Sequence, residues 1–375
     1  MKIQKFLIAL GLFFSVTSYG QNARFSQLWS APMQFNPSLT GRFDGKVRLG
    51  SLYSSQQSDL ADMNHLNIGV DAKFGPFKTN GDEKTPPLEK VVEGKDEVYN
   101  KAHNLRGYWG AGINYYQYGH NKGPFSAQFV SASLARHFYN KSNKFYGFGV
   151  QATYASGNLD ETKGTAYDKE ISGGGFRFPT PSGSLTPGLR KGSQNYMDFN
   201  AGGYYGMNTE AVMFELGGAM YHLFYPKNDA MNLDEESKLR HRVTAYSLLR
   251  LKFNPKWGII QRNMYWQEGL YLRSKTFSDS MNIVDFWSGL EFYKINPAKN
   301  INLNFGFYTR SFRTMMPFVN LNLGKYATIR GTYEQPINSK KYNAYSAQRA
   351  EVSLILNYGR ETAPGTRFYK KTQPW

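Results

Sequence analysis

The feature that most constrains this sequence is an alternation of apolar and polar residues that recurs along most of its length. In 67–74, apolar side chains alternate with Asn, Gly, Asp and Lys, and 300–309, 318–324 and 351–358 repeat the pattern. Successive side chains of a β-strand point to opposite faces, so each segment would have one apolar and one polar face. Soluble sheets alternate too, but repetition along a whole chain is typical of transmembrane barrels.

We expect an all-β chain: a transmembrane antiparallel β-barrel of the outer-membrane type with about fourteen strands. Most of the predicted strands have at least the roughly nine residues that a tilted strand needs to cross a bilayer. They are expected near residues 44–54, 66–74, 108–119, 125–139, 144–156, 196–207, 210–223, 241–253, 258–274, 282–293, 300–309, 316–324, 326–335 and 348–358.

The first residues have the pattern of a cleaved signal peptide. Lysines in Met1–Lys5 precede an apolar core at Phe6–Phe14, and Ser15–Gly20 is mostly small and polar. This core is too short to span a bilayer, so we expect cleavage near Gly20. No run of 18 apolar residues follows, which leaves a closed barrel as the way to cross a membrane.

Composition supports a barrel and excludes several functions. Aromatic residues make up 16% of the chain although its mean hydropathy is −0.55, as expected when strands have one lipid-facing and one lumen-facing side. The absence of cysteine excludes disulfides, thiolate zinc sites and a catalytic Cys. The net charge of +17 is dispersed and has no nucleic-acid-binding motif beside it, so an acidic partner or lipopolysaccharide phosphate is the expected counterpart.

One connection does not fit the expected pattern of short periplasmic turns and long extracellular loops. Short segments rich in Asn, Pro and Lys, such as 140–143 and 254–256, suit periplasmic turns, whereas 157–195 and 226–240 suit extracellular loops. The segment 75–107 is long and highly charged, yet strand parity places it on the periplasmic side. Either an early strand is miscounted or this segment contacts a partner in the periplasm.

Charged residues occupy the face of the predicted strands that does not meet lipid. Exposed to lipid at mid-bilayer, Arg or Lys would cost about 2–4 kcal/mol. These residues either form ion pairs that fill the barrel or line a lumen or mouth that grips a secreted domain. They are Arg48, Asp71, Lys73, Glu215, Arg242, Arg250, Asp285, Glu291 and Glu351.

The residues between the signal peptide and the first strand form a candidate plug or partner-binding element. Several are large and apolar and would need a packing role. Asn36–Gly41 has turn chemistry and could simply set the start of the first strand. Alternatively, the segment folds into the barrel or along its periplasmic rim. The candidate residues are Phe25, Leu28, Trp29, Phe35, Asn36 and Pro37.

The sequence predicts no catalysis. No pair of its six histidines has metal-ligand spacing with a third donor nearby, and no nucleophile elbow or phosphate loop occurs. We therefore expect no enzyme, metal or cofactor. We divide the chain into four regions: a signal peptide at 1–20, an N-terminal segment at 21–43 that lies at the periplasmic rim or in the lumen, a transmembrane barrel at 44–358, and a basic periplasmic tail at 359–375.

Both ends of the chain resemble a known family. Phe25-Ser26-Gln27 and Asn36-Pro37-Ser38-Leu39-Thr40-Gly41 resemble the opening of the PorP/SprF family of the Bacteroidetes type IX secretion system, with Ser38 where Ala is usual. Residues 330–334 and 349–354 resemble the family's last two strands, with Tyr333-Glu334 in place of Tyr-Asp.

The resemblance implies a non-enzymatic outer-membrane barrel needed to secrete and anchor a large adhesin that carries a C-terminal sorting domain, in gliding bacteria a motility adhesin. Other type IX secretion or gliding components in the periplasm, membrane lipid and lipopolysaccharide would be further partners, and nucleic acid would not. Two alternatives stay open: a passive porin or substrate channel, and a structural scaffold for periplasmic components.

Overall fold

The computed structural model describes residues 25–43, 45–57, 63–75, 105–120, 125–140, 144–159, 192–209, 212–226, 239, 241–253, 264–274, 283–296, 301–310, 314–323, 326–337 and 348–359. The predicted signal peptide, residues 76–104 of the charged segment and residues 360–375 of the predicted tail lie outside these ranges.

The described residues form fourteen antiparallel strands that close into a barrel. This confirms the predicted fold, and each predicted strand overlaps one observed strand. The strands are β1 (Val47–Gln57), β2 (Met63–Phe74), β3 (Leu105–His120), β4 (Phe125–Asn140), β5 (Lys144–Leu159), β6 (Gly192–Asn208), β7 (Val212–Tyr221), β8 (Arg242–Phe253), β9 (Met264–Ser274), β10 (Ile283–Asn296), β11 (Ile301–Arg310), β12 (Thr314–Leu323), β13 (Ala327–Pro336) and β14 (Gln348–Tyr358).

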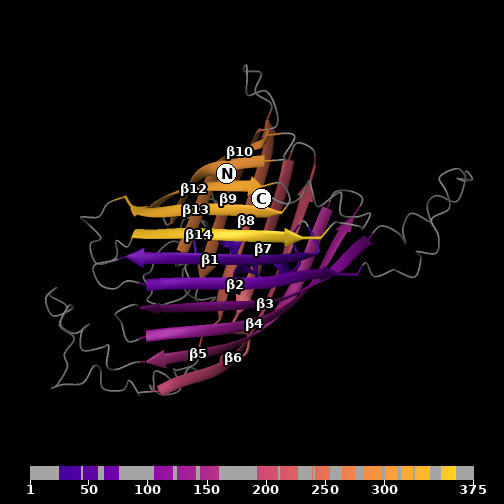
Figure 1. Ribbon diagram of the computed structural model, residues 1–375. Helices are drawn as coiled ribbons and strands as arrows, with labels where there is room; N and C mark the ends of the chain where they lie inside the picture. The colour runs from indigo at the N-terminus through magenta and orange to yellow at the C-terminus, as the bar shows by residue number, and fades with distance from the viewer. Residues whose placement is uncertain are drawn as a thin grey trace, which may run out of the picture.

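Pairing of the first strand with the last closes the ring. β1 pairs with β14 from Val47↔Tyr358 to Gln57↔Gln348, and each other strand pairs with its neighbours in sequence (Figure 1). Odd-numbered strands begin at one rim of the barrel, and even-numbered strands end there. We call this rim the first rim and the opposite one the second rim. Closure pairs the edges that an open sheet would leave exposed.

This topology resolves the long charged connection. β2 ends at Phe74 and β3 begins at Leu105, so the connection leaves and re-enters the barrel at the first rim. The interpretation that an early strand is miscounted is therefore wrong. The last residues of the predicted segment, 105–107, belong to β3.

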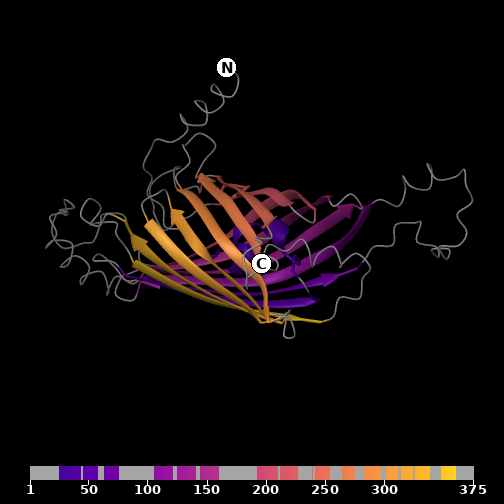
Figure 2. The same cartoon turned by 90° about the horizontal axis from the view of Figure 1, so that it is seen from above.

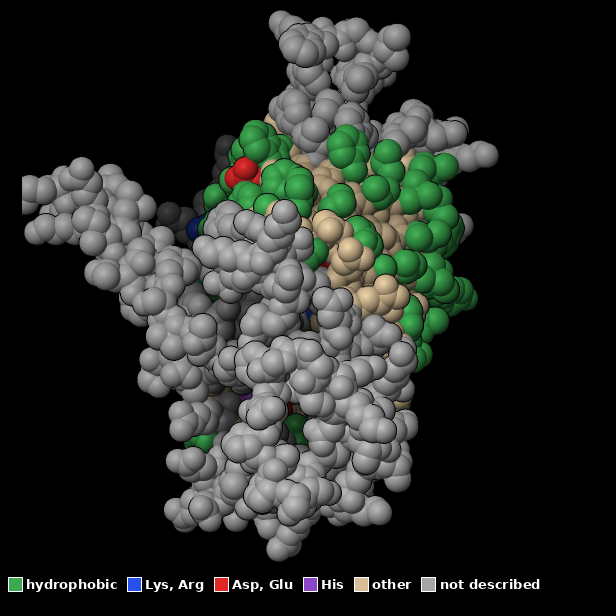
Figure 3. Space-filling model, turned by 90° about the vertical axis from the view of Figure 1, so that its left-hand side faces the viewer, with side chains coloured by type: hydrophobic (Ala, Val, Ile, Leu, Met, Phe, Trp, Pro, Cys, Tyr) green, Lys and Arg blue, Asp and Glu red, His purple; other side chains and the backbone are tan. Residues whose placement is uncertain are grey.

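Alternation places apolar side chains outside and polar ones inside. On β14, Val352 is 59% exposed whereas the adjacent Glu351 is 1% exposed, and the alternation continues along the strand. Figure 3 shows hydrophobic side chains over much of the outer strand surface that is visible in that view. Such a large exposed apolar surface would be unusual for a soluble protein and suits contact with lipid.

Three short helices precede the barrel: η1 (Leu28–Ser30), α2 (Pro32–Phe35) and η2 (Pro37–Leu39). Pro32 and Pro37 each occupy the first position of a helix, where the missing N–H costs nothing. The helices lie behind the wall of β14 and β1 in Figure 1 and are enclosed by strands in the view of Figure 2. No helix among the described residues is long and apolar enough to cross a bilayer.

Candidate functional site

Residues 25–43, which we call the lumen segment, lie inside the barrel. Every residue of the segment is buried except Gln34, which is half-buried. The segment contacts inward-facing groups on strands all round the barrel, including Glu351 on β14, Asp71 on β2, Gln151 on β5 and Tyr246 on β8. This segment is the candidate functional site, and it contains all six candidate plug or partner-binding residues.

The segment extends along most of the lumen. Phe25 packs edge-to-face on His65 and Tyr116, with ring centroids 5.9 and 5.6 Å apart, close to the second-rim ends of β2 and β3. At its other end, the backbone N–H of Gly41 donates to Asp71 at 2.6 Å, close to the first rim. The chain therefore runs from near the second rim to the first rim before β1 begins.

The other aromatic candidates form a cluster with tyrosines of the wall. Trp29 and Phe35 pack on Tyr246 with centroid separations of 5.4 and 5.1 Å, and Phe35 lies 4.9 Å from Tyr271. Leu28 belongs to the same buried cluster. Aromatic pairs of this geometry contribute about 0.5–1.5 kcal/mol each beyond the area that they bury.

Asn36 connects the turn at Pro37 to the barrel wall. Its Oδ1 caps η2 by accepting hydrogen bonds from the Ser38 N–H at 2.9 Å and the Ser38 hydroxyl at 2.7 Å. Its Nδ2 donates to the carbonyls of Gly203 on β6 and Gly218 on β7, at 3.3 and 3.2 Å. One fully buried side chain thus satisfies both the helix start and two carbonyls of the wall.

Thr40 attaches the next part of the turn to β4. Its hydroxyl donates to Ser133 Oγ at 2.8 Å, and its carbonyl lies 2.7 Å from His137 Nε2, which donates to it. His137 Nδ1 lies 2.6 Å from the Tyr204 hydroxyl. The Asn36–Gly41 element is therefore a capped turn that lies in the lumen.

Inward-facing glycines allow the segment to approach the wall closely. A Cβ at Gly149 on β5 would lie 2.6 Å from the Pro37 carbonyl oxygen, and one at Gly202 on β6 would lie 2.1 Å from Asn36 Oδ1. Both distances are far below van der Waals contact. Side chains at these wall positions would displace the turn.

Three predicted lumen carboxylates hold the segment. Glu351 accepts hydrogen bonds from the backbone N–H of Ser26, at 2.9 Å to each carboxylate oxygen, and from that of Gln27 at 3.1 Å. Glu215 forms a bidentate ion pair with Arg42. Asp71, besides its bond to the segment, forms a bidentate pair with Arg48 at 2.8 and 2.6 Å. Charge-assisted bonds are the stronger class of hydrogen bond, so these contacts fix both ends of the segment.

The charge of Arg42 is stabilised by its partner. Burial lowers the pKa of the guanidinium, whereas the Glu215 carboxylate, with smaller contributions from Tyr204 and Tyr246, raises it, and the net pKa lies above the ordinary value. Arg42 also lies over the Tyr204 ring, 4.3 Å from its centroid. The pair is thus a permanent ionic contact between segment and wall.

The remaining lumen candidates are distributed along the wall. Lys73 Nζ lies 5.1 Å from the Phe43 ring centroid, Arg242 lies over Tyr221 at 3.9 Å, and Arg250 is buried. Asp285 and Glu291 belong to β10, but their side chains lie outside the described part of the structure. In the described residues, no group of three or more His, Asp or Glu side chains could hold a metal ion.

Comparison with known proteins assigns the chain to a family. A family model described as type IX secretion system membrane protein PorP/SprF matches residues 17–356. The chain belongs to this family. With its barrel fold, this membership makes it an outer-membrane barrel of a secretion system, and the lumen segment contains both N-terminal elements that resemble the family.

Two solved structures show a distant likeness to the chain. The Ralstonia pickettii toluene transporter TbuX is 13% identical, with a TM-score of 0.42 over 86% of this chain and 91% of that one. Haemophilus ducreyi BamA lacking POTRA domains 1–3 is 12% identical, with a TM-score of 0.43 over 84% of this chain and 70% of that one. At these values the likenesses carry no argument about function. No curated protein sequence matches the chain.

Sequence reasoning missed several inward-facing residues of this PorP/SprF chain. Arg310 pairs with Glu334 at 3.2 Å, and Arg349 lies 3.8 Å from the same carboxylate. The period-two pattern could have found Arg349, because it shares a face with Glu351. Gln27 and Arg42 carried no comparable signal, since they lie outside the strands.

Proposed function

We propose that this PorP/SprF barrel is needed to secrete and anchor a large surface adhesin, a gliding-motility adhesin, by binding its C-terminal sorting domain without catalysing a reaction. The observation that carries the proposal is the combination of family membership with a lumen occupied by the chain's own residues. A barrel filled in this way suits a binding or anchoring role better than free diffusion of solutes.

The orientation of the barrel in the membrane follows from the expected signal peptide, cleaved near Gly20, and from strand parity. The first rim would face the periplasm, where residues 76–104 and the basic tail after Gly359 would contact other secretion or gliding components. The second rim, with the long connections at 160–191 and 227–238, would face the outside and meet lipopolysaccharide and cargo.

Deletion of the gene tests the proposal. The adhesin should still be made in the deletion strain but be absent from the cell surface, and a plasmid copy of the wild-type gene should restore it. Surface labelling of intact cells, compared with total adhesin in lysates, measures both quantities. Normal surface display in the deletion strain would contradict the proposal.

A passive porin or substrate channel is the alternative function. It requires an open path past the lumen segment, whose contacts reach strands on opposite sides of the barrel, from Glu351 on β14 to Tyr221 on β7. Conductance of the purified protein in planar bilayers distinguishes the two functions. A steady open pore in the wild-type protein would favour the channel, and a closed barrel would favour the anchor.

A further inference from the structure

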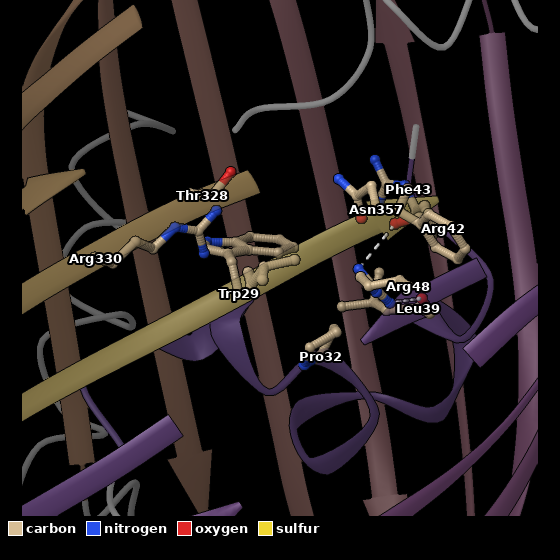
Figure 4. Close-up of a pocket in the computed structure, with 10 residues that line it drawn as sticks. Trp29, Pro32, Leu39, Arg42, Phe43, Arg48, Thr328, Arg330 and Asn357 are labelled. Atoms are coloured by element: carbon tan, nitrogen blue, oxygen red, sulfur yellow. Dashed lines mark hydrogen bonds between the residues drawn. The ribbon is translucent and has the colours of Figure 1, made fainter. Parts of the chain in front are cut away.

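The carboxylates that the structure describes inside the barrel all have partners. Beside the small cavity of Figure 4, Arg42 and Arg48 each form an ion pair with a carboxylate, and Arg48 Nη1 also donates to the Arg42 carbonyl at 3.3 Å. Each described inward-facing carboxylate is at most 6% exposed and has a basic side chain or a backbone N–H within 3.2 Å. These residues are Asp71, Asp198, Glu215, Glu334 and Glu351.

Glu268 differs from these carboxylates because it lies on the outer face of the barrel. It is the fifth residue of β9. Gln267 and Tyr271, on one face of this strand, are buried, whereas Trp266, on the other face, is 45% exposed. Alternation along the strand therefore directs Glu268 outward with Trp266. The Glu268 side chain is partly exposed, and among the described residues no hydrogen bond or ion pair reaches it.

The strand register places Glu268 within an apolar surface. Glu268 pairs with Leu249 on β8 and with Ser288 on β10, and both of these residues lie away from the ends of their strands. Apolar side chains surround it on the outer face towards both rims: Leu249, Leu251, Trp266, Leu270 and Phe286. Ionisable side chains in a membrane are rare and usually pair with another group, so an outward carboxylate at this depth indicates a partner.

Ser288 extends the polar spot beside Glu268. Its hydroxyl oxygen accepts a hydrogen bond from Trp266 Nε1 at 2.9 Å, which joins β9 to β10 on the outer face. Ser288 can still donate its own proton, so the spot offers a carboxylate and a hydroxyl on neighbouring strands. Of the described side chains on this face of β8, β9 and β10, none is basic.

The wall next to this spot has little side-chain volume on its outer face. Gly203 on β6 pairs with Gly218 on β7, which pairs with Ala245 on β8. Gly217 faces the lumen, because a Cβ there would lie 2.4 Å from the Tyr246 ring, so Gly218 faces outward. Small residues allow another protein to approach a membrane-embedded wall closely.

We propose that the outer face of β8–β10 around Glu268 docks the wall of a different outer-membrane protein that presents a Lys or Arg side chain to this carboxylate. Charge complementarity selects the cation, because a charge-assisted hydrogen bond satisfies both ions away from water. A two-fold contact between copies of this chain would use the same face twice and bring two Glu268 carboxylates together, so the partner is not a second copy. The proposal concerns the outer wall and does not rest on the adhesin as cargo.

Photo-cross-linking of the full-length protein in intact cells tests the proposal. The photoreactive residue p-benzoylphenylalanine replaces Leu249, which pairs with Glu268, and in a control it replaces Leu354, which is 40% exposed on β14. Irradiation should give a discrete adduct with another outer-membrane protein from position 249 and none from position 354. Mass spectrometry of the adduct should place a Lys or Arg of the partner beside the cross-linked site.

Substitution of Glu268 tests the role of its charge. Glu268→Gln keeps the shape of the side chain, and the yield of the adduct should fall by about tenfold or more, as expected for loss of a hydrogen bond between charged groups. Gln128→Leu is the control, since Gln128 is an exposed polar residue on β4, and it should leave the yield unchanged. Glu268→Lys should abolish the adduct, and exchange of the mapped basic residue of the partner for Glu should restore it.

The purified barrel provides a second measurement that needs no partner. In phosphatidylcholine vesicles at neutral pH, Glu268→Leu should shift the folding equilibrium towards the barrel by roughly threefold or more, because the wild-type carboxylate then meets lipid. Equal folding of this variant and the wild type would overturn the proposal, since Glu268 would not face lipid. Absence of an adduct from position 249, an adduct with a second copy of this chain, or an equal yield in Glu268→Gln would each overturn it as well.

Discussion

Gly149 offers the sharpest test that the lumen segment is packed against the wall. An added Cβ would lie 2.6 Å from the Pro37 carbonyl oxygen and 2.7 Å from Ser38 Cα. Ordinary carbon contacts are about 3.5–4.0 Å, so Gly149→Ala must displace the η2 turn or the strand by roughly 1 Å. Gly157 is the matched control: it lies on the same face of β5, and a Cβ there meets nothing within 4 Å.

The structure sets the expected size of the effect. The η2 turn cannot retreat freely, because Asn36 is bonded to β6 and β7 and Thr40 to β4. Overpacking of this kind typically costs about 1–3 kcal/mol. Gly157→Ala should have no such cost and should be neutral or slightly stabilising, since glycine in a strand interior is unfavourable by about 0.5–1 kcal/mol relative to alanine.

Hydrogen exchange of the purified protein in detergent measures this difference. In Gly149→Ala, amides of residues 25–43 should exchange about 5- to 150-fold faster than in the wild type, the factor that corresponds to 1–3 kcal/mol. Amides of β10–β14 should be unaffected in both variants. Equal protection of the segment in Gly149→Ala and Gly157→Ala would refute the reasoning that the segment lies against this wall.

Three further substitutions test other contacts. Glu351→Gln keeps the shape of the side chain but removes the negative charge that accepts hydrogen bonds from the N–H groups of Ser26 and Gln27. Hydrogen exchange at these two amides should therefore accelerate by about tenfold. Unchanged exchange would count against Glu351 as an anchor. Asn36→Ala removes the cap of η2 and both hydrogen bonds to the carbonyls of the wall. The free energy of unfolding, measured in urea, should fall by about 1–3 kcal/mol. A loss below about 0.5 kcal/mol would contradict these contacts. Val352→Arg places a charge on the outer face of β14. The free energy of folding into lipid vesicles should become less favourable by about 2–4 kcal/mol, the cost of such a charge near the bilayer centre. No change would mean that this face does not meet lipid.

Much of the architecture could be predicted because the barrel depends on a local pattern. Alternation in 351–358 fixes which side chains of β14 face outward, and the length of each alternating run fixes where a strand can cross. Strand ends differ from the prediction where a strand is longer than a bilayer crossing requires, as in β6, which has 17 residues and begins at Gly192 rather than near 196. Sequence reasoning also named Glu351, Asp71 and Glu215 as lumen residues from their parity alone.

What the lumen carboxylates bind could not be predicted in the same way. Ser26 and Glu351 are 325 residues apart, and Arg42 and Glu215 are 173 apart. Their contact exists because the strands close into a ring and the N-terminal residues enter that ring. The sequence by itself determined the strands, their two faces and the need for a closed barrel, since these follow from a repeat of period two. Only the tertiary structure decided that the interior is filled by residues 25–43 and which wall residues hold them, because those contacts depend on closure and on the path of a segment without periodic signal.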